Sequence, residues 1–352
     1  MTARLLAKAF RDWSSTDEPL VLASVYETEG STYSKAGAQM LITRDGIFQG
    51  MLSGGCLEGD LAARARNVAD SGVPDLVTYD LRADDDDLWG LGVGCDGMIR
   101  VFLQRLHKEN GYEPFASMCS AYEGTDWQVA VTVVDSKVRD LGVGASMVIG
   151  EGSVVWSDIA AQYQDELCAT ADTALSSKRS LSQVVELGNY SCELLLSILR
   201  PYPRVLVLGA GIDAIPIVRL IAELGWRATV SDHRPAYIES GDFSAADDVF
   251  CVAATDFANE LNLDQFDAAI VMSHHLITDS SYLRALAATQ IPYIGLLGPP
   301  HRRERLLNDL ESERPLLENR LHGPAGIDIG ASGPASIALS IVAQMHQEII
   351  GR

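Results

Sequence analysis

The sequence contains no long apolar run, no closely paired cysteines and no excess of basic side chains, and each absence limits what the protein can be. No stretch approaches the roughly 20 apolar residues of a membrane span, and the first residues lack a signal peptide's apolar core. We therefore expect a cytoplasmic protein with no membrane partner. The six cysteines form no Cys-x-x-Cys pair, so neither a zinc module nor a disulfide framework is expected.

The charge balance is strongly acidic, because 48 Asp and Glu face 27 Lys and Arg and leave a net charge of −21. A field of this sign repels phosphate backbones and anionic lipids, so we expect no nucleic-acid partner. The densest acidic run, residues 84–87, is interpreted as a solvated loop. Apolar residues make up 47% of the chain, which predicts a folded protein, and 352 residues suffice for two domains.

Residues 30–58 hold the first feature that suggests a site, two glycine-bearing turns on either side of an expected hairpin. The second turn reads Ser-Gly-Gly-Cys-Leu-Glu, and its glycines would let the backbone approach a ligand closely. Its thiol precedes an expected helix, and helix N-termini attract anions and favour thiolates. The alternative is a buried free cysteine in a tight turn. The residues of this turn predicted to contact a ligand are Ser53, Gly54, Gly55, Cys56 and Glu58.

An internal repeat favours a function for this turn. Residues 129–132 resemble residues 22–25, and the segment from Gly144 resembles the segment from Gly37 at the same spacing. The second copy has no counterpart of the Cys56 turn, so the scaffold does not need that turn in order to fold. A hairpin pattern shared by unrelated segments is the alternative.

A second glycine-rich loop, residues 88–97, presents Cys95 with Asp96 beside it. The loop again offers backbone amides and a thiol. The two Gly-Cys loops either frame a shared pocket or form independent tight turns.

Hydrophobic spacing and turn residues predict the elements before and after a boundary at Pro201 and Pro203. The expected domains are residues 1–200 and 201–352. In the first, we expect helices at 3–13, 112–122 and 159–177, strands at 20–26, 75–81 and 98–103, and strand and turn character at 187–199.

The strongest local signal follows this boundary, where residues 204–232 read as strand, glycine turn, helix and strand. The turn carries a G-x-G-x-x-A pattern, and an acid follows its first glycine by 23 residues, which predicts a dinucleotide-binding fold. Asp232 would bond a ribose hydroxyl, whereas Arg234 favours a 2′-phosphate or another anion. A Rossmann-type domain without nucleotide is the alternative. The turn residues expected at the phosphate are Gly209, Gly211, Ile212 and Asp213.

Further strands are expected at 248–252, 268–274 and 293–298. The second ends at His274 and His275, where open α/β sheets bind ligands, so either histidine is a candidate base or ligand, or a structural side chain. Arg302 lies in a basic stretch at an expected helix start and is interpreted either as a phosphate contact or as part of a solvated helix face.

Taken over both expected domains, the sequence resembles the XdhC/CoxI family of maturation factors for xanthine dehydrogenase and carbon monoxide dehydrogenase. The resemblance covers nearly the whole chain and implies an α/β fold, with a C-terminal Rossmann-like parallel-sheet domain after a mixed-sheet α/β domain that has a weak internal repeat. It rests on residues 30–33, 37–41, 53–58, 90–95, 209–211, 232–234, 293–298 and 323–330.

The resemblance implies an accessory protein rather than an enzyme, with the molybdenum cofactor (molybdopterin) as cargo. Family members are described as binding this cofactor, promoting its sulfuration and delivering it to an apo-hydroxylase. The implied partners are the molybdenum hydroxylase, a sulfur-donating cysteine desulfurase and a second copy of the chain. We hypothesise that the 209–214 turn holds the phosphate end. Cys56, with Cys95 second, would face molybdenum in a cleft between the domains, as a soft ligand or sulfur carrier.

Two other classes of function remain open. An NAD(P)-dependent oxidoreductase would use the Rossmann site for its cofactor, His274 or His275 as acid or base, and Cys56 near the substrate. A redox-sensing or scaffold protein would keep the fold without a cofactor. The maturation factor ranks first because an oxidoreductase gives the two Gly-Cys loops no role beyond lining a pocket.

Overall fold

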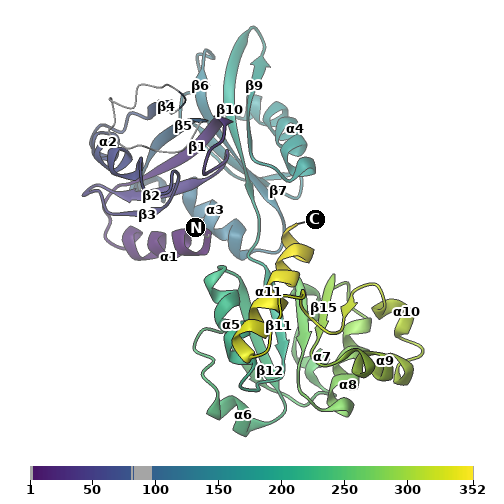
Figure 1. Cartoon of the computed structure of the whole chain (residues 1–352). Helices are drawn as coiled ribbons and strands as arrows, with labels where there is room; N and C mark the ends of the chain where they lie inside the picture. Colours follow the sequence, from purple (N-terminus) through teal and green to yellow (C-terminus); the bar gives the residue numbers. More distant parts are fainter. Residues whose placement is uncertain (1–2, 81, 83–96, 352) are drawn as a thin grey trace. The chain divides into compact units, whose positions relative to one another are not determined.

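The computed structural model describes residues 3–80, 82 and 97–351, and the chain divides into two units (Figure 1). The first unit is Met1–Pro201 and the second is Tyr202–Arg352. Two antiparallel sheets form the first unit, and one parallel sheet forms the second. Within the described ranges no helix is both long enough and apolar enough to cross a bilayer.

The first unit repeats one arrangement twice along the chain. The first copy comprises α1 (Ala3–Ser14), β1 (Leu20–Gly30), β2 (Gln39–Thr43), β3 (Phe48–Gly50), α2 (Glu58–Ser71), β4 (Asp75–Asp80) and β5 (Gly97–Leu106). After the short helix η1 (Lys108–Asn110), the second copy comprises α3 (Phe115–Glu123), β6 (Gln128–Ser136), β7 (Ser146–Gly150), β8 (Ser153–Ser157), α4 (Ala161–Ser177), β9 (Leu181–Leu187) and β10 (Tyr190–Leu199). The sheet orders β3-β2-β1-β5-β4 and β8-β7-β6-β10-β9 correspond strand by strand, which confirms the internal repeat.

The spacing expected between the repeated segments is wrong by one residue. Val25 of β1 exchanges backbone hydrogen bonds with residues 37–38, and Val133 of β6 exchanges the same bonds with residues 144–145. Equivalent residues of the two copies are therefore 108 positions apart in β1 and β6, but 107 positions apart at residues 37–38 and 144–145. Both β1 and β6 are buried on both faces over most of their length, so their apolar pattern does not alternate and does not reveal the register.

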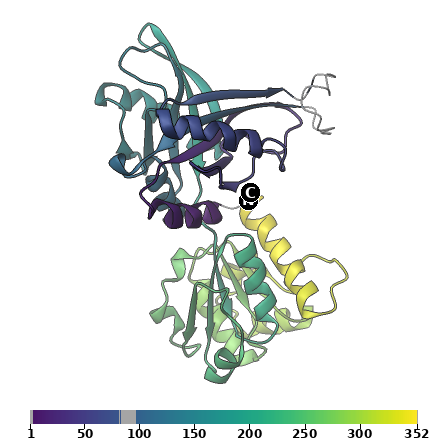
Figure 2. The same cartoon turned by 90° about the vertical axis from the view of Figure 1, so that its left-hand side faces the viewer.

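An apolar cluster joins the two sheets of the first unit. Tyr26 and Phe102 of the first sheet pack with Val134 and Leu195 of the second. Helix α2 covers the first sheet on another side and α4 covers the second. Figure 2 shows α2, in dark blue, lying across the strands of its sheet. Each sheet is thus packed between a helix and the other sheet.

The second unit is a doubly wound parallel sheet. Its elements are β11 (Arg204–Leu208), α5 (Ala214–Glu223), β12 (Arg227–Asp232), α6 (Pro235–Ser240), β13 (Asp248–Cys251), α7 (Phe257–Glu260), η2 (Leu263–Gln265), β14 (Ala268–Val271), α8 (Leu276–Ala287), β15 (Tyr293–Leu296), α9 (Pro300–Asp309), α10 (Arg314–Leu317), β16 (Leu321–His322) and α11 (Pro334–Ile350). The order β13-β12-β11-β14-β15-β16 is that of the Rossmann fold, so this prediction is confirmed. Helices α5 and α11 cover one face, and α8 and α9 cover the other.

Several expected boundaries are wrong. The strand predicted to reach His274 ends at Val271, and residues 181–199 form the hairpin β9–β10, whose first strand the sequence pattern misses. The pattern also misses helix α8, because this helix buries the polar residues Thr278 and Asp279 and so lacks a clean apolar stripe. Strand β9 has polar residues at three of its seven positions and buries only Val185 and Leu187, so its apolar pattern is weak as well.

The cluster between the two sheets yields a stability prediction. Phe102 is 1% exposed, so Phe102→Ala should lower the free energy of unfolding by about 3–5 kcal/mol through lost burial and an unfilled cavity. Urea denaturation measures the difference. Val155→Ala, at a position 53% exposed in β8, is the control and should change stability by less than about 0.5 kcal/mol. Equal effects of the two substitutions would contradict this packing.

Candidate functional site

A buried carboxylate shapes the turn that carries Cys56. Glu58, the first residue of α2, is 2% exposed. Its Oε1 accepts the N–H groups of Leu52 and Ser53 at 2.7 and 2.8 Å. Its Oε2 accepts the Ser53 hydroxyl at 2.7 Å and the N–H groups of Gly55 and Leu57 at 3.0 and 3.2 Å. The side chain at the start of the helix therefore organises the loop before it.

This arrangement assigns different tasks to the predicted residues of the turn. Burial raises the pKa of Glu58, but the hydrogen bonds from Ser53 and Leu52 outweigh burial and leave that pKa below its ordinary value. Ser53 is also buried, and its hydroxyl accepts the Leu57 N–H at 2.8 Å. Both side chains thus support the loop from inside. Gly54 and Gly55 are exposed and Cys56 is half-buried, so these three residues form its accessible part.

The accessible part of the turn lies beside the first glycine motif. Gly54 has a φ of +82° and Gly55 a φ of +114°, a backbone conformation that other residues rarely adopt. A side chain at Gly54 would begin 3.7 Å from the ring of Tyr33, which is itself 59% exposed. The sequence predictions left Tyr33 out of the candidate site, although it belongs to the Gly-Ser-Thr-Tyr motif, and its place beside Gly54 makes it a further candidate.

The end of the second glycine-rich loop also meets the first motif. Gly97 packs so closely that a Cβ there would lie 2.5 Å from the carbonyl oxygen of Ser31 and 2.7 Å from Cγ2 of Thr32. Cys95 and the acidic run at 84–87 lie outside the described residues. The chain therefore brings residues 31–33, Gly54 and Gly97 to one end of the first sheet.

In the second unit, the glycine turn after β11 packs against the end of β14. A Cβ on Gly209, whose φ is +128°, would lie 2.6 Å from the carbonyl oxygen of Met272, so only glycine fits there. Gly211 lies beside Asp213, because a Cβ there would be 2.5 Å from that carboxylate. Ile212 is 82% exposed at the tip of the turn. The turn is thus placed at the point where the strand order reverses.

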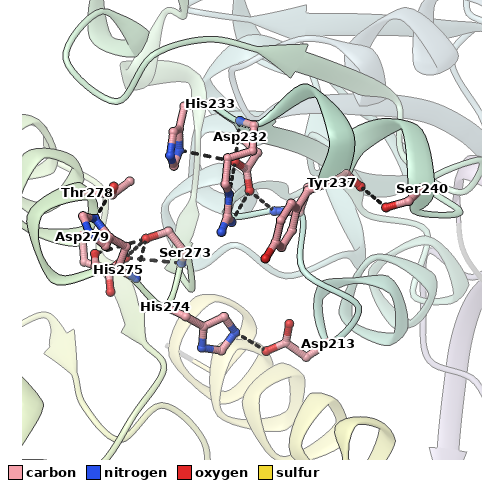
Figure 3. A network of polar contacts seen from close by, with 12 residues as sticks. Asp213, Asp232, His233, Tyr237, Ser240, Ser273, His274, His275, Thr278 and Asp279 are labelled. Atoms are coloured by element: carbon pink, nitrogen blue, oxygen red, sulfur yellow. Dashed lines mark hydrogen bonds and ion pairs between the residues drawn. The ribbon is translucent and has the colours of Figure 1, made fainter.

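Asp213 and His274 form an ion pair across this point. His274 Nε2 lies 2.8 Å from Asp213 Oδ2, and the two side chains point toward one another in Figure 3. The hydrogen bond to Asp213 raises the pKa of His274 above its ordinary value. His274 also has a φ of +63°, and its side chain is 55% exposed. The predicted turn residue and the predicted histidine are therefore in direct contact.

The acid at the end of β12 is occupied by the protein itself. Asp232 is fully buried, and its Oδ2 accepts the Ala210 N–H and Nη2 of Arg234, both at 2.7 Å. Its Oδ1 accepts N–H and Nε–H of Arg234, both at 2.9 Å. Burial alone would raise the pKa of Asp232. The hydrogen bonds from Arg234 and Ala210 have the larger, opposite effect and leave that pKa below its ordinary value. Arg234 lies 3.7 Å above the ring of Tyr237 and remains 26% exposed. The carboxylate expected at a ribose thus holds an arginine.

Arg302 is similarly engaged by a carboxylate. Its Nη2 lies 2.6 Å from Oδ2 of Asp279, which is 1% exposed and whose Oδ1 accepts the Ser273 hydroxyl. The pair ties α9 to α8 and to the end of β14, next to His274. Asp279 carries no signal in the sequence, because a lone acid inside a helix is usually solvated.

The described residues contain no cluster of three or more His, Cys, Asp or Glu side chains that could hold a metal ion. The described residues could therefore contact molybdenum through Cys56 only if the other ligands of the metal came from the cofactor itself. The predicted site residues form two groups, the Cys56 turn in the first unit and the sheet edge in the second.

Comparison with known proteins decides the family. The XdhC and CoxI family matches residues 13–80, and the XdhC Rossmann domain matches residues 205–345. A Bacillus subtilis protein, named as a probable xanthine dehydrogenase subunit, is 32% identical over 340 residues, which cover 94% of this chain and 93% of that protein. The chain belongs to the XdhC and CoxI family. The resemblance noted in the sequence is confirmed.

Two other proteins extend this comparison. The Escherichia coli "molybdenum cofactor insertion chaperone PaoD" is 22% identical to this XdhC/CoxI chain over 335 residues, which cover 93% of this chain and 84% of that protein. The crystal structure of a Bacillus halodurans protein, described as a xanthine dehydrogenase, matches with a TM-score of 0.79 and 30% identity. The match covers 98% of this chain and 96% of that one.

Glu58 gives the turn a pH-dependent stability. Its pKa is lowered in the folded state, so its contribution is present above the ordinary Glu pKa of about 4.3 and is lost as pH falls through the folded-state value. Glu58→Gln should lower the free energy of unfolding by about 1–3 kcal/mol at pH 7, because a Gln side chain cannot accept all these bonds. Urea unfolding should show this difference shrinking at lower pH. The exposed Glu186→Gln is the control and should show neither effect.

The Asp213–His274 pair predicts a titration shift. Asp213→Asn should lower the pKa of His274 toward the ordinary value of about 6.5, because the carboxylate that favours the imidazolium is gone. In the wild type the pair contributes below that ordinary value, and the contribution is lost as pH rises through the raised pKa. NMR titration of the imidazole protons measures both values. Asp264→Asn, at an exposed position of the same unit, should leave the titration unchanged, and an unshifted His274 in Asp213→Asn would contradict the pairing.

Proposed function

We propose that this chain binds the molybdenum cofactor as cargo and delivers it to the apo form of a molybdenum hydroxylase, of the xanthine dehydrogenase or the carbon monoxide dehydrogenase type. The name of the E. coli relative supports an accessory role rather than an enzymatic one. Family membership supports the same class of client.

The observation that carries the proposal is the difference between the two halves of the first unit. The first half uses residues 51–57 to connect β3 to α2, whereas the second connects β8 to α4 with residues 158–160. The longer connection is the Cys56 turn, held from inside by Glu58 and accessible at Gly54, Gly55 and Cys56. A repeated scaffold that carries one elaborated turn favours a function for that turn.

The chemistry of the accessible groups fits the cargo. Molybdopterin has a soft metal–dithiolene end, a flat pterin and a phosphate. A thiol such as Cys56 is a soft ligand that suits molybdenum, and the exposed Tyr33 ring offers a stacking surface to the pterin. Arg234, His274 and the N–H groups of residues 211–213 are donors suited to the phosphate end, whereas the N–H groups of Gly209, Ala210 and Ala214 already bond within the protein.

The finer steps and partners that we propose are those that the family resemblance implies. A cysteine desulfurase would supply sulfur while this chain holds the cofactor, and a homodimer is the expected assembly. The strongly acidic chain suits a basic docking face on the hydroxylase.

The oxidoreductase alternative is less well supported. A dinucleotide cofactor commonly places an adenosine ribose on the acid after the second strand, but Asp232 already accepts four hydrogen bonds from Ala210 and Arg234. Ribose binding in that manner would have to break a buried ion pair. Binding of NADP through its 2′-phosphate at Arg234 is the version of the alternative that an experiment should test.

Cofactor content tests the proposal directly. The protein purified without oxygen from a cofactor-producing host should contain close to one molybdenum and one pterin per chain. Cys56→Ala should weaken retention about tenfold, which corresponds to ~1.4 kcal/mol of binding free energy. Cys251→Ala removes an exposed thiol of the second unit and should retain the cofactor like the wild type.

The outcomes separate the alternatives. Equal retention by Cys56→Ala and the wild type would show that the turn is not the cargo site. Absence of molybdenum and pterin from all three proteins, with a rise in melting temperature on adding NADPH, would favour the oxidoreductase.

A further inference from the structure

A pocket of about 300 Å³ lies between the two halves of the first unit. It is at the end of α2 opposite to the Cys56 turn, because Gly72, which follows the last turn of that helix, is one of its lining residues. The first half contributes Pro74, Gln104 and Arg105 to the walls, and the second half contributes residues 142–145 and Asp158. Nothing in the function proposed above uses these residues.

Gln104 lines the pocket without a hydrogen-bond partner among the described residues. Gln104 is only 5% exposed, yet no hydrogen bond from the described part of the chain reaches its amide, and its Oε1 lies 3.9 Å from where a Cβ on Gly144 would be. The side chain lines the pocket, so its amide is available to a group that binds there.

Arg105 is held in place without being neutralised. Its guanidinium lies over Gly72, because a Cβ there would be 2.7 Å from Cζ and Nη2. This position is at the C-terminal end of α2, where the helix dipole favours a cation. No carboxylate among the described residues forms an ion pair with it. Across the pocket, Asp158 accepts the Ser146 N–H at 2.7 Å through Oδ1 alone.

The internal repeat provides a comparison within the same molecule. Val21 pairs with Arg105 in the first sheet, and its counterpart Val129 pairs with Ile198 in the second. By the same registers, Ser197 corresponds to Gln104. The two long polar side chains of the pocket are thus replaced by a short one and an apolar one at the equivalent place.

At that equivalent place the two halves are in close contact. Ser180, which corresponds to Pro74, accepts the Ile198 N–H at 2.9 Å, and a Cβ on Gly37 would lie only 2.4 Å from its hydroxyl. At Gly144, the nearest atom to such a Cβ is Cγ of Pro74 at 3.4 Å. The fold itself therefore does not require the open, polar arrangement around Gln104 and Arg105.

We infer that this pocket binds a small molecule with a carboxylate or phosphate group for Arg105 and an N–H donor for Asp158, with Gln104 bonding between them. The guanidinium fork matches the oxygens of either anion. Glu113, whose carboxylate accepts the Ser117 N–H and hydroxyl, lines the pocket as well. A lining with one guanidinium and two carboxylates favours a ligand that carries both an anionic group and N–H donors. A volume of about 300 Å³ is at the lower limit of ligand sites, so the ligand is a single small metabolite.

Binding to the full-length chain tests this inference with two sets of probes. One set is the twenty proteinogenic amino acids, which carry a carboxylate and an ammonium group. The other is AMP, GMP and CMP, which carry a phosphate and base N–H groups. Saturation-transfer NMR identifies any binder at millimolar concentration, and calorimetry then measures its affinity. A binder in the first set identifies a carboxylate ligand and one in the second a phosphate ligand.

Variants locate the binding. Arg105→Gln and Gln104→Leu should each weaken the affinity tenfold or more, whereas Arg66→Gln removes the same charge from the exposed side of α2 and should have no effect. Circular dichroism checks folding, and Gln104→Leu decides the outcome if Arg105→Gln does not fold. The inference is overturned if neither set binds, or if the folded variants bind as the wild type does.

Discussion

A carboxylate that is removed from water must receive its hydrogen bonds from the protein, and this constraint shapes both candidate regions. Glu58 draws the amides of the preceding loop around itself, Asp232 fixes Arg234 at the end of β12, and Asp279 fixes Arg302. Each carboxylate uses donors that the sequence motifs offer to a ligand. Accessible groups that remain include a thiol, an aromatic ring, an exposed imidazole and parts of the Arg234 and Arg302 guanidinium groups.

Sequence patterns predict the large-scale organisation because each depends on local chemistry. The Rossmann turn needs Gly209 where the backbone meets Met272, and the duplicated hairpins share their spacing to within one residue. The roles of Ser53, Glu58 and Asp232 could not be predicted, because a motif residue looks the same whether it bonds a ligand or its own loop. Tyr33 belongs to a sequence motif, but its place beside Gly54 depends on how two turns meet in space. Asp279 gives no signal, since its partner Arg302 is far along the chain.

The duplicated first unit shows how one scaffold can hold unequal features. The two sheets have the same strand order, yet only one half carries the elaborated turn before its helix, and only one of the two equivalent contacts is lined by Gln104 and Arg105. Both differences lie in connections or at strand ends, where a change of length or side chain leaves the ladders intact. The repeat therefore serves as an internal reference for judging which residues the fold itself needs.

The same repeat has a consequence for the order in which the chain acquires its structure. In the described part of the first unit, every ladder joins strands of one half, so each sheet can complete its hydrogen bonds without the other. The cluster of Tyr26, Phe102, Val134 and Leu195 then requires only that two formed sheets dock. Strands β1 and β6 can pair early with β2 and β7, but β1 gains its other neighbour only when β5 is made and β6 only when β10 is made, so each sheet is completed late in the synthesis of its half. A nascent chain would thus expose the apolar face around Phe102 until the second sheet is complete, and this interval is when it is most prone to aggregation.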